Sequence, residues 1–149
     1  MKACEGRIGR AFVIRLEHGD MVPACIERFA EENSISVGHV ILVGGMGGGK
    51  IVAGPKRSEE RPPQPVLVPI DNAYETAGVG ILAPDKNGKP VLHMHGTFGR
   101  SGKVLTGCMR PGVITWLIGE VIIYEIIGTD AARIMDSESG FELLELGHS

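Results

Sequence analysis

The sequence contains few aromatic residues, few cysteines and no excess of basic residues. Aromatic side chains make up 5% of the 149 residues, and the three cysteines, Cys4, Cys25 and Cys108, follow no regular spacing. A small, odd number of cysteines argues against a disulfide framework and suits a reducing compartment, so we expect a cytoplasmic protein. Fifteen Lys and Arg against 18 Asp and Glu give a formal net charge of −3, which disfavours a function that grips nucleic acid through a basic face.

The sequence also shows no segment of the kind that crosses or enters a membrane. The longest apolar run, Val113 to Ile127, is interrupted by Glu120 and Glu125 and is shorter than a membrane-spanning helix. The first residues contain no apolar signal core, so we expect no export and no membrane partner. A length of 149 residues predicts a single domain, residues 1–149, with a substantial hydrophobic core.

Glycine and proline are abundant, with 22 and nine residues, and this composition favours short strands and tight turns over a helix bundle. Apolar residues at helical spacing predict one core-facing helix, with Asp20 as its N-cap: Val22, Cys25, Ile26, Phe29 and Ala30. A second, short helix is predicted over 131–135. Alternating or continuous apolar runs predict strands over 11–16, 37–44, 66–70, 75–83, 91–98, 104–109, 113–127 and 141–146. The expected fold class is α+β, a mostly antiparallel sheet covered by one main helix after the first strand.

A glycine-rich segment, Gly44 to Lys50, matches the first seven positions of the phosphate-binding pattern G-x-x-x-x-G-K. Ile51 stands where a Ser or Thr would hold Mg²⁺, and the residues after it (Val-Ala-Gly-Pro) do not begin the helix that meets the phosphates. We therefore expect no nucleotide cofactor, and a glycine-rich hairpin loop between two strands.

Two histidines and a cysteine lie on adjacent predicted strands joined by a tight turn within 99–102. His93 and His95 are two residues apart, so both side chains leave the same face of their strand. A turn with an even number of loop residues places His95 opposite Thr106 and His93 opposite Cys108, on that same face. Two imidazoles and a thiolate are three of the four ligands of a typical zinc site, so we predict a site for zinc or another divalent transition metal.

His39, at the start of an inner strand, is an additional candidate ligand. A closed site of four protein ligands including His39 would be structural, whereas three ligands with an open position could activate water. In the alternative interpretation the histidines are polar residues on a solvated face and Cys108 is a small buried apolar side chain.

The same residues resemble the plants-and-prokaryotes-conserved (PPC) domain, whose members have H-x-H followed by a G-G-H segment. The similarity extends over nearly the whole chain and includes His93 to His95, Val104 to Cys108, Gly9 to Leu16 and Asp136 to Phe141. This chain departs from the family at Cys108, where the family tends to place a third histidine. The resemblance implies a homotrimer, and the strand 113–127 has apolar residues on both faces that a subunit interface would cover.

The function expected from these features is a PPC-like trimeric protein with a metal site. The resemblance also implies an alternative, because PPC domains accompany AT-hook segments in plants and prokaryotic relatives are described as predicted DNA-binding proteins. This chain has no Arg-Gly-Arg-Pro core of an AT-hook and no recognisable helix-turn-helix. A third hypothesis is a module that binds a protein partner. The sequence assigns no reaction, since Glu75, Glu120 and Arg110, the nearest polar residues, form no catalytic pattern.

Overall fold

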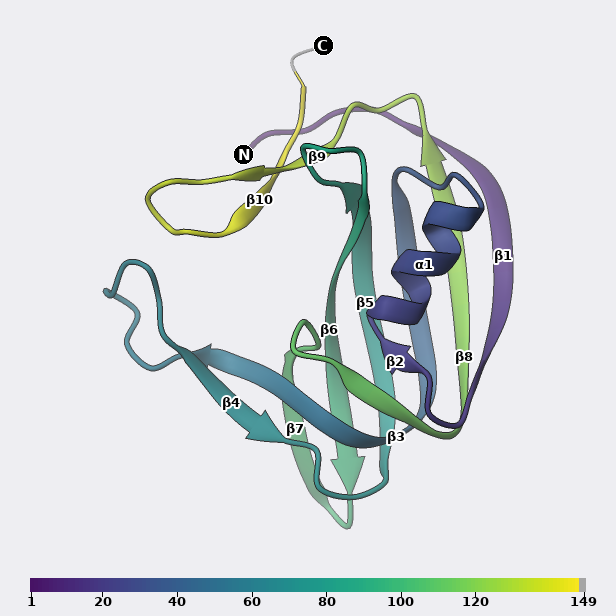
Figure 1. Cartoon of the computed structure of the whole chain (residues 1–149), viewed down its shortest axis with the longest axis vertical. Helices are drawn as coiled ribbons and strands as arrows, with labels where there is room; N and C mark the ends of the chain where they lie inside the picture. The colour runs from purple at the N-terminus through teal and green to yellow at the C-terminus, as the bar shows by residue number, and fades with distance from the viewer. Residues whose placement is uncertain (148–149) are drawn as a thin grey trace.

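A single curved antiparallel sheet dominates the computed structural model, which describes residues 1–147 (Figure 1). Its eight strands are β1 Arg7–Glu17, β2 Met21–Val22, β3 Gly38–Pro55, β4 Pro65–Pro69, β5 Tyr74–Pro84, β6 Pro90–Arg100, β7 Lys103–Cys108 and β8 Val113–Ile127. The strand order is β1-β8-β3-β5-β6-β7, with β2 paired to β8 and β4 paired to β3. One helix, α1 Ala24–Glu32, lies across one face of the sheet (Figure 1). The predicted fold class, a mostly antiparallel sheet with one helix after the first strand, is confirmed.

The helix buries the predicted apolar stripe against the sheet. Ile26 and Ala30 are fully buried, and Cys25 packs against the same core, where burial raises the pKa of its thiol to about 11. Burial of a thiol disfavours the thiolate, so Cys25 belongs to the packing of the core. Among the described residues, no helix is long and apolar enough to cross a membrane.

The predicted N-cap of this helix is wrong. Pro23 occupies the cap position without a side-chain hydrogen bond, and Asp20 instead accepts a hydrogen bond of 2.9 Å from the backbone N–H of Glu17. The reason is that Val22 pairs with Val113 in the short strand β2, which delays the start of the helix.

The glycine-rich segment is not a hairpin loop but the middle of β3, so that prediction is also wrong. Gly44 and Gly49 have φ of 134° and 95°, which allows the strand to bulge and bend there. A Cβ at Gly44 would lie 2.6 Å from the carbonyl oxygen of Ile118, so the two backbones approach too closely for any side chain. Beyond this bend, the second half of β3 pairs with β4 and, at Val52 opposite Cys108, with β7.

The predicted short helix over 131–135 is replaced by a strand. β9 Ala132–Met135 pairs with β10 Glu142–Glu145 in a separate two-stranded hairpin, and the predicted turn over 136–140 joins them. Ser139 donates a backbone hydrogen bond of 2.7 Å to Asp136 in this turn. Pairing with β10 overrides the local helix preference of the segment.

Candidate metal centre

The β6–β7 hairpin decides which residues of the candidate site face one another. Its turn residues, Ser101 and Gly102, have φ of 48° and 75°, as a two-residue type I′ turn requires. The turn pairs Arg100 with Lys103, and the register continues to His95 opposite Cys108. The predicted pairing of His93 with Cys108 is therefore wrong by two residues. A shift of two keeps every side chain on its original face, so the cluster survives the error.

His93, His95 and Cys108 bring their ligating atoms within 4.8 Å of one another. The two Nε2 atoms are 3.1 Å apart, and the rings meet edge to face at 78°. A tetrahedral zinc with Zn–N bonds of about 2.0–2.1 Å separates two nitrogen ligands by roughly 3.3 Å, so the observed spacing fits a shared ion. Cys108 is buried and is fixed by pairing with both β6 and β3.

The environment of His93 favours its neutral form. Burial, the largest cause, and the positive charge of Arg133 together lower the pKa of His93 to about 4. Metals bind the neutral imidazole, so this histidine is ready to act as a ligand at neutral pH. The chemistry of the donor set, two imidazoles and one thiol, suits zinc and related divalent ions.

His39 does not join this cluster. It is exposed on β3 and pairs with Ile81 of β5, which in turn pairs with His93 of β6. One strand therefore separates the two histidines, which corresponds to roughly 9–10 Å at ordinary strand spacing. Among the described residues, the group of donor atoms contains three side chains and no fourth.

A hollow of about 580 Å³ opens beside the cluster. The loop that follows β3 forms one wall and the β9–β10 hairpin forms another, and both lie on the same side of the molecule (Figure 1). Arg110 and Arg133 also line it. The sequence did not identify Arg133 as a site residue. Its segment was predicted to be a helix, and no local pattern indicates where the C-terminal segment packs.

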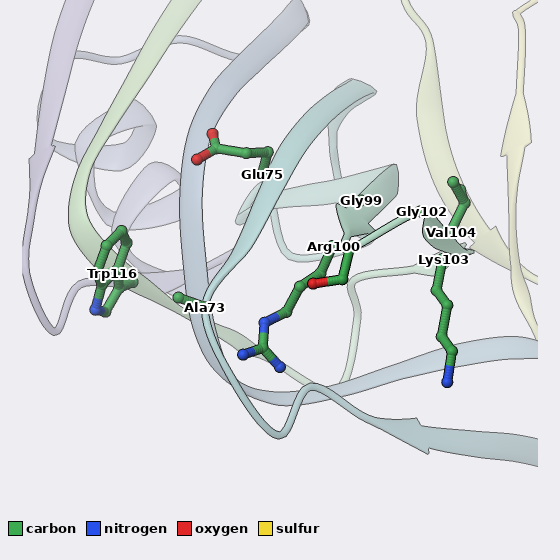
Figure 2. Close-up of a pocket in the computed structure, with 9 residues that line it drawn as sticks. Ala73, Glu75, Gly99, Arg100, Gly102, Lys103, Val104 and Trp116 are labelled. Atoms are coloured by element: carbon green, nitrogen blue, oxygen red, sulfur yellow. The ribbon is translucent and has the colours of Figure 1, made fainter.

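A second hollow, of about 550 Å³, lies at the β6–β7 turn (Figure 2). Figure 2 shows the charged ends of Arg100 and Lys103 directed away from the carboxylate of Glu75, with Trp116 on the other side of the view. Glu75 pairs with Gly99, four residues along β6 from His95, so it belongs to this hollow and not to the metal cluster. The polar groups here converge on no common point, and we assign this hollow no function.

Comparison with known proteins places this chain in a family. A model of the Plants and Prokaryotes Conserved (PCC) domain, also abbreviated PPC, matches residues 3–127. A solved structure of a metal-containing protein from Archaeoglobus fulgidus is 25% identical, with a TM-score of 0.83, over 97% of this chain and 99% of that one. A PPC protein from Pyrococcus horikoshii is 21% identical, with a TM-score of 0.79, over 98% of this chain and 100% of that one.

A further neighbour from Bacteroides thetaiotaomicron, described as a candidate DNA-binding protein, is 17% identical with a TM-score of 0.75 and covers 94% of this chain and 96% of its own. No curated protein matches the chain. The family match ends before β9, so the hairpin that carries Arg133 lies outside the matched residues. The resemblance expected from the sequence is confirmed: the chain belongs to the Plants and Prokaryotes Conserved domain family.

Proposed function

We propose that this protein binds zinc or another divalent transition metal through His93, His95 and Cys108. The observation that carries the proposal is the convergence of their ligating atoms within 4.8 Å, on two strands whose register leaves little freedom. The similarity to a protein from Archaeoglobus described as metal-containing supports it. The substitution of cysteine for the third histidine of the family keeps a residue that ligates zinc.

The chemistry open to this site follows from its three protein ligands. A metal ion bound by three residues supplies an open position and lowers the pKa of a bound water. The chain contributes a neutral His93, a thiol buried between two strands, and a hollow lined by two arginines. We assign no reaction, because no carboxylate of the described residues joins the donor cluster as a general base.

The test is a metal analysis of protein purified without an affinity tag. We expect about one equivalent of a transition metal per chain after exhaustive dialysis. Replacement by Co²⁺ should then produce a thiolate-to-cobalt charge-transfer band, and Cys108→Ser should abolish that band. Protein that neither retains zinc nor takes up cobalt would contradict the proposal.

We also propose a homo-oligomer, most simply a trimer, as the family resemblance implies. Support comes from the sheet face opposite α1, where the strand register aligns an apolar row across four strands: Val13, Ile122, Ile41 and Val79. Val13 and Val79 are 85% and 58% exposed in the single chain, and such a row is normally covered by a partner. Sedimentation should show a trimer that Val79→Glu dissociates; a monodisperse monomer at micromolar concentration would overturn this.

We also propose a cytoplasmic location, because three free cysteines suit a reducing compartment.

A further inference from the structure

We propose that the hollow beside the metal cluster binds a small organic acid, with its carboxylate held by Arg133 and Arg110 and its hydrocarbon part against the apolar walls. This proposal adds a ligand class to the proposed metal site. It depends on that site in one respect only, because a metal ion bound there could also coordinate the organic acid. The two arginines provide the recognition on their own, so the inference can be tested in metal-free protein.

Arg133 is a buried cation that no carboxylate of residues 1–147 contacts directly, although Glu142 lies close enough to act on its charge. It is 5% exposed, and among the described residues it forms no ion pair. One terminal nitrogen donates a 3.1 Å hydrogen bond to the carbonyl oxygen of Ile81, whereas its Nε has no partner among the residues described. Burial of an unpaired charge is expensive, and native proteins rarely retain such a group without a use for it. An anion entering the hollow would supply the missing acceptor.

Arg110 adds a second positive charge to the same hollow. Its guanidinium lies over the ring of Phe141, 5.5 Å from the centroid, which holds the side chain against the β9–β10 hairpin. Glu142 also lines the hollow and contributes one negative charge. Two arginines and one glutamate leave a net charge of +1, which matches a ligand carrying a single negative charge. A guanidinium binds a carboxylate through two parallel N–H···O bonds, a geometry that few other anions match as well.

Apart from Gln64 and the metal cluster, the remaining walls are apolar, which indicates that the ligand is more than a bare anion. They are formed by residues of the bent strand, the proline-rich loop and the hairpin: Val52, Pro55, Pro63, Pro65, Leu143 and Leu144. Transfer of a short hydrocarbon chain from water to this apolar surface has a favourable free energy, because it removes apolar surface from water on both sides. A volume of about 580 Å³ lies within the usual range of roughly 300–1,000 Å³ for small-molecule sites.

The test is calorimetric titration of hexanoate into metal-stripped and zinc-loaded protein. Hexanoate should bind the metal-stripped wild type saturably, and Arg133→Met, which keeps the length and removes the charge, should weaken binding at least tenfold. Arg100→Met provides the matched control, because Arg100 is an exposed arginine of the β6–β7 turn outside this hollow, and it should leave binding unchanged. 1-Hexanol, which has the chain without the charge, should bind at least tenfold more weakly than hexanoate.

Arg110→Met is a second variant that keeps the test decisive if Arg133→Met does not fold, since Arg110 is exposed; it should weaken hexanoate binding at least threefold. The inference is overturned if neither form of the protein binds hexanoate, if neither variant weakens binding, if hexanol binds as tightly, or if inorganic phosphate binds more tightly than hexanoate. Hexanoate binding that depends on Arg133 in a protein that takes up no metal would support the inference while contradicting the proposed metal site. One equivalent of metal without hexanoate binding would do the reverse.

Discussion

Two arginines of this protein lie in contrasting environments. Arg10 donates to the carboxylate of Glu125 from Nε at 2.8 Å and from a terminal nitrogen at 2.7 Å, and its backbone N–H adds a third bond of 3.1 Å. Arg133 is more deeply buried and has no carboxylate partner among the described residues. The charge of Arg10 is therefore neutralised within the fold, whereas the charge of Arg133 remains available to bind a ligand.

The local backbone explains why Arg10 is satisfied. A bulge in β1 between Ile8 and Ala11 wraps the chain around the side chain of Glu125, and a Cβ at Gly9 would lie only 2.8 Å from its carboxylate oxygen. The hydrogen bonds from Arg10 lower the pKa of Glu125 to about 2. This cluster is a closed structural unit, and the Gly-Arg of the family-like segment 9–16 is part of it.

The largest expected effect concerns the metal cluster. Cys108→Ser should lower zinc affinity by at least about a hundredfold, because a hydroxyl is a poor ligand for a borderline metal. Mutation of residues that only hydrogen-bond to metal ligands already lowers metal affinity by about 10–100-fold. Cys108→His should retain much of the affinity, since imidazole also ligates zinc. Competition with a chromophoric chelator measures both values.

The alternative interpretation of Cys108 as a packed thiol orders these variants oppositely. Cys108→Ser would then reduce the melting temperature slightly, Cys108→His would reduce it more through overpacking, and the metal content would not change. Measuring metal content and melting temperature on both variants therefore separates the two interpretations.

The second prediction contrasts the two arginine environments in stability. Glu125→Gln removes the charged acceptor of Arg10 and should lower the free energy of unfolding by about 1.5 kcal/mol. Arg133→Met removes a buried charge that forms no ion pair among the described residues, so we expect the free energy of unfolding to stay the same or rise by up to about 1 kcal/mol. Urea unfolding of the ligand-free protein measures both, and a larger loss for Arg133→Met would refute the contrast.

The third prediction is that His93 and Glu125 make the stability of the metal-free protein depend on pH in two separate ranges. The folded pKa of His93, about 4, is below its ordinary value of 6.5, so the unfolded chain binds the proton first and stability falls as pH drops from about 6.5 to about 4. The folded pKa of Glu125, about 2, is below its ordinary 4.5, so its contribution is lost as pH drops from about 4.5 to about 2. His93→Gln should flatten only the upper window and Glu125→Gln only the lower, as measured by urea midpoints across pH.

The smallest expected effect concerns DNA. Glu125 neutralises Arg10, Arg133 is buried, and the net charge is −3, so neither region offers a row of phosphate contacts. We expect no sequence preference and at most weak binding by this chain alone. A gel shift at about 0.15 M salt that survives scrambled competitor would contradict this expectation.

Local sequence patterns were sufficient to predict most of the strands. β8 has the predicted bounds of Val113–Ile127, and β4 to β7 lie within two residues of their predicted ranges. Alternating or continuous runs of apolar and β-branched residues are local signals, so they can be recognised without knowledge of the tertiary structure. The three-residue donor set could be predicted for the same reason. His93 and His95 share a face by their spacing, and an even-residue turn puts Cys108 on it whichever even register is chosen.

Features that depend on contacts between residues far apart in the chain could not be predicted from the sequence. The glycine run was predicted as a loop, but close approach to the β8 backbone makes it a bend within β3, and this bend brings Val52 against Cys108. The segment carrying Arg133 has helix-compatible residues, yet pairing with β10 makes it a strand.

The sequence by itself thus determined the fold class and, through the resemblance of its motifs, the family. It also determined which three side chains share the candidate metal cluster, because that follows from spacing along two paired strands. Only the tertiary structure decided that one strand separates His39 from the cluster and that Arg133, whose Nε has no partner within residues 1–147, lines the hollow beside it. Both depend on which strands become neighbours and on where the C-terminal hairpin packs. Those outcomes are set by the burial of side chains far apart in the chain, and no local pattern records them.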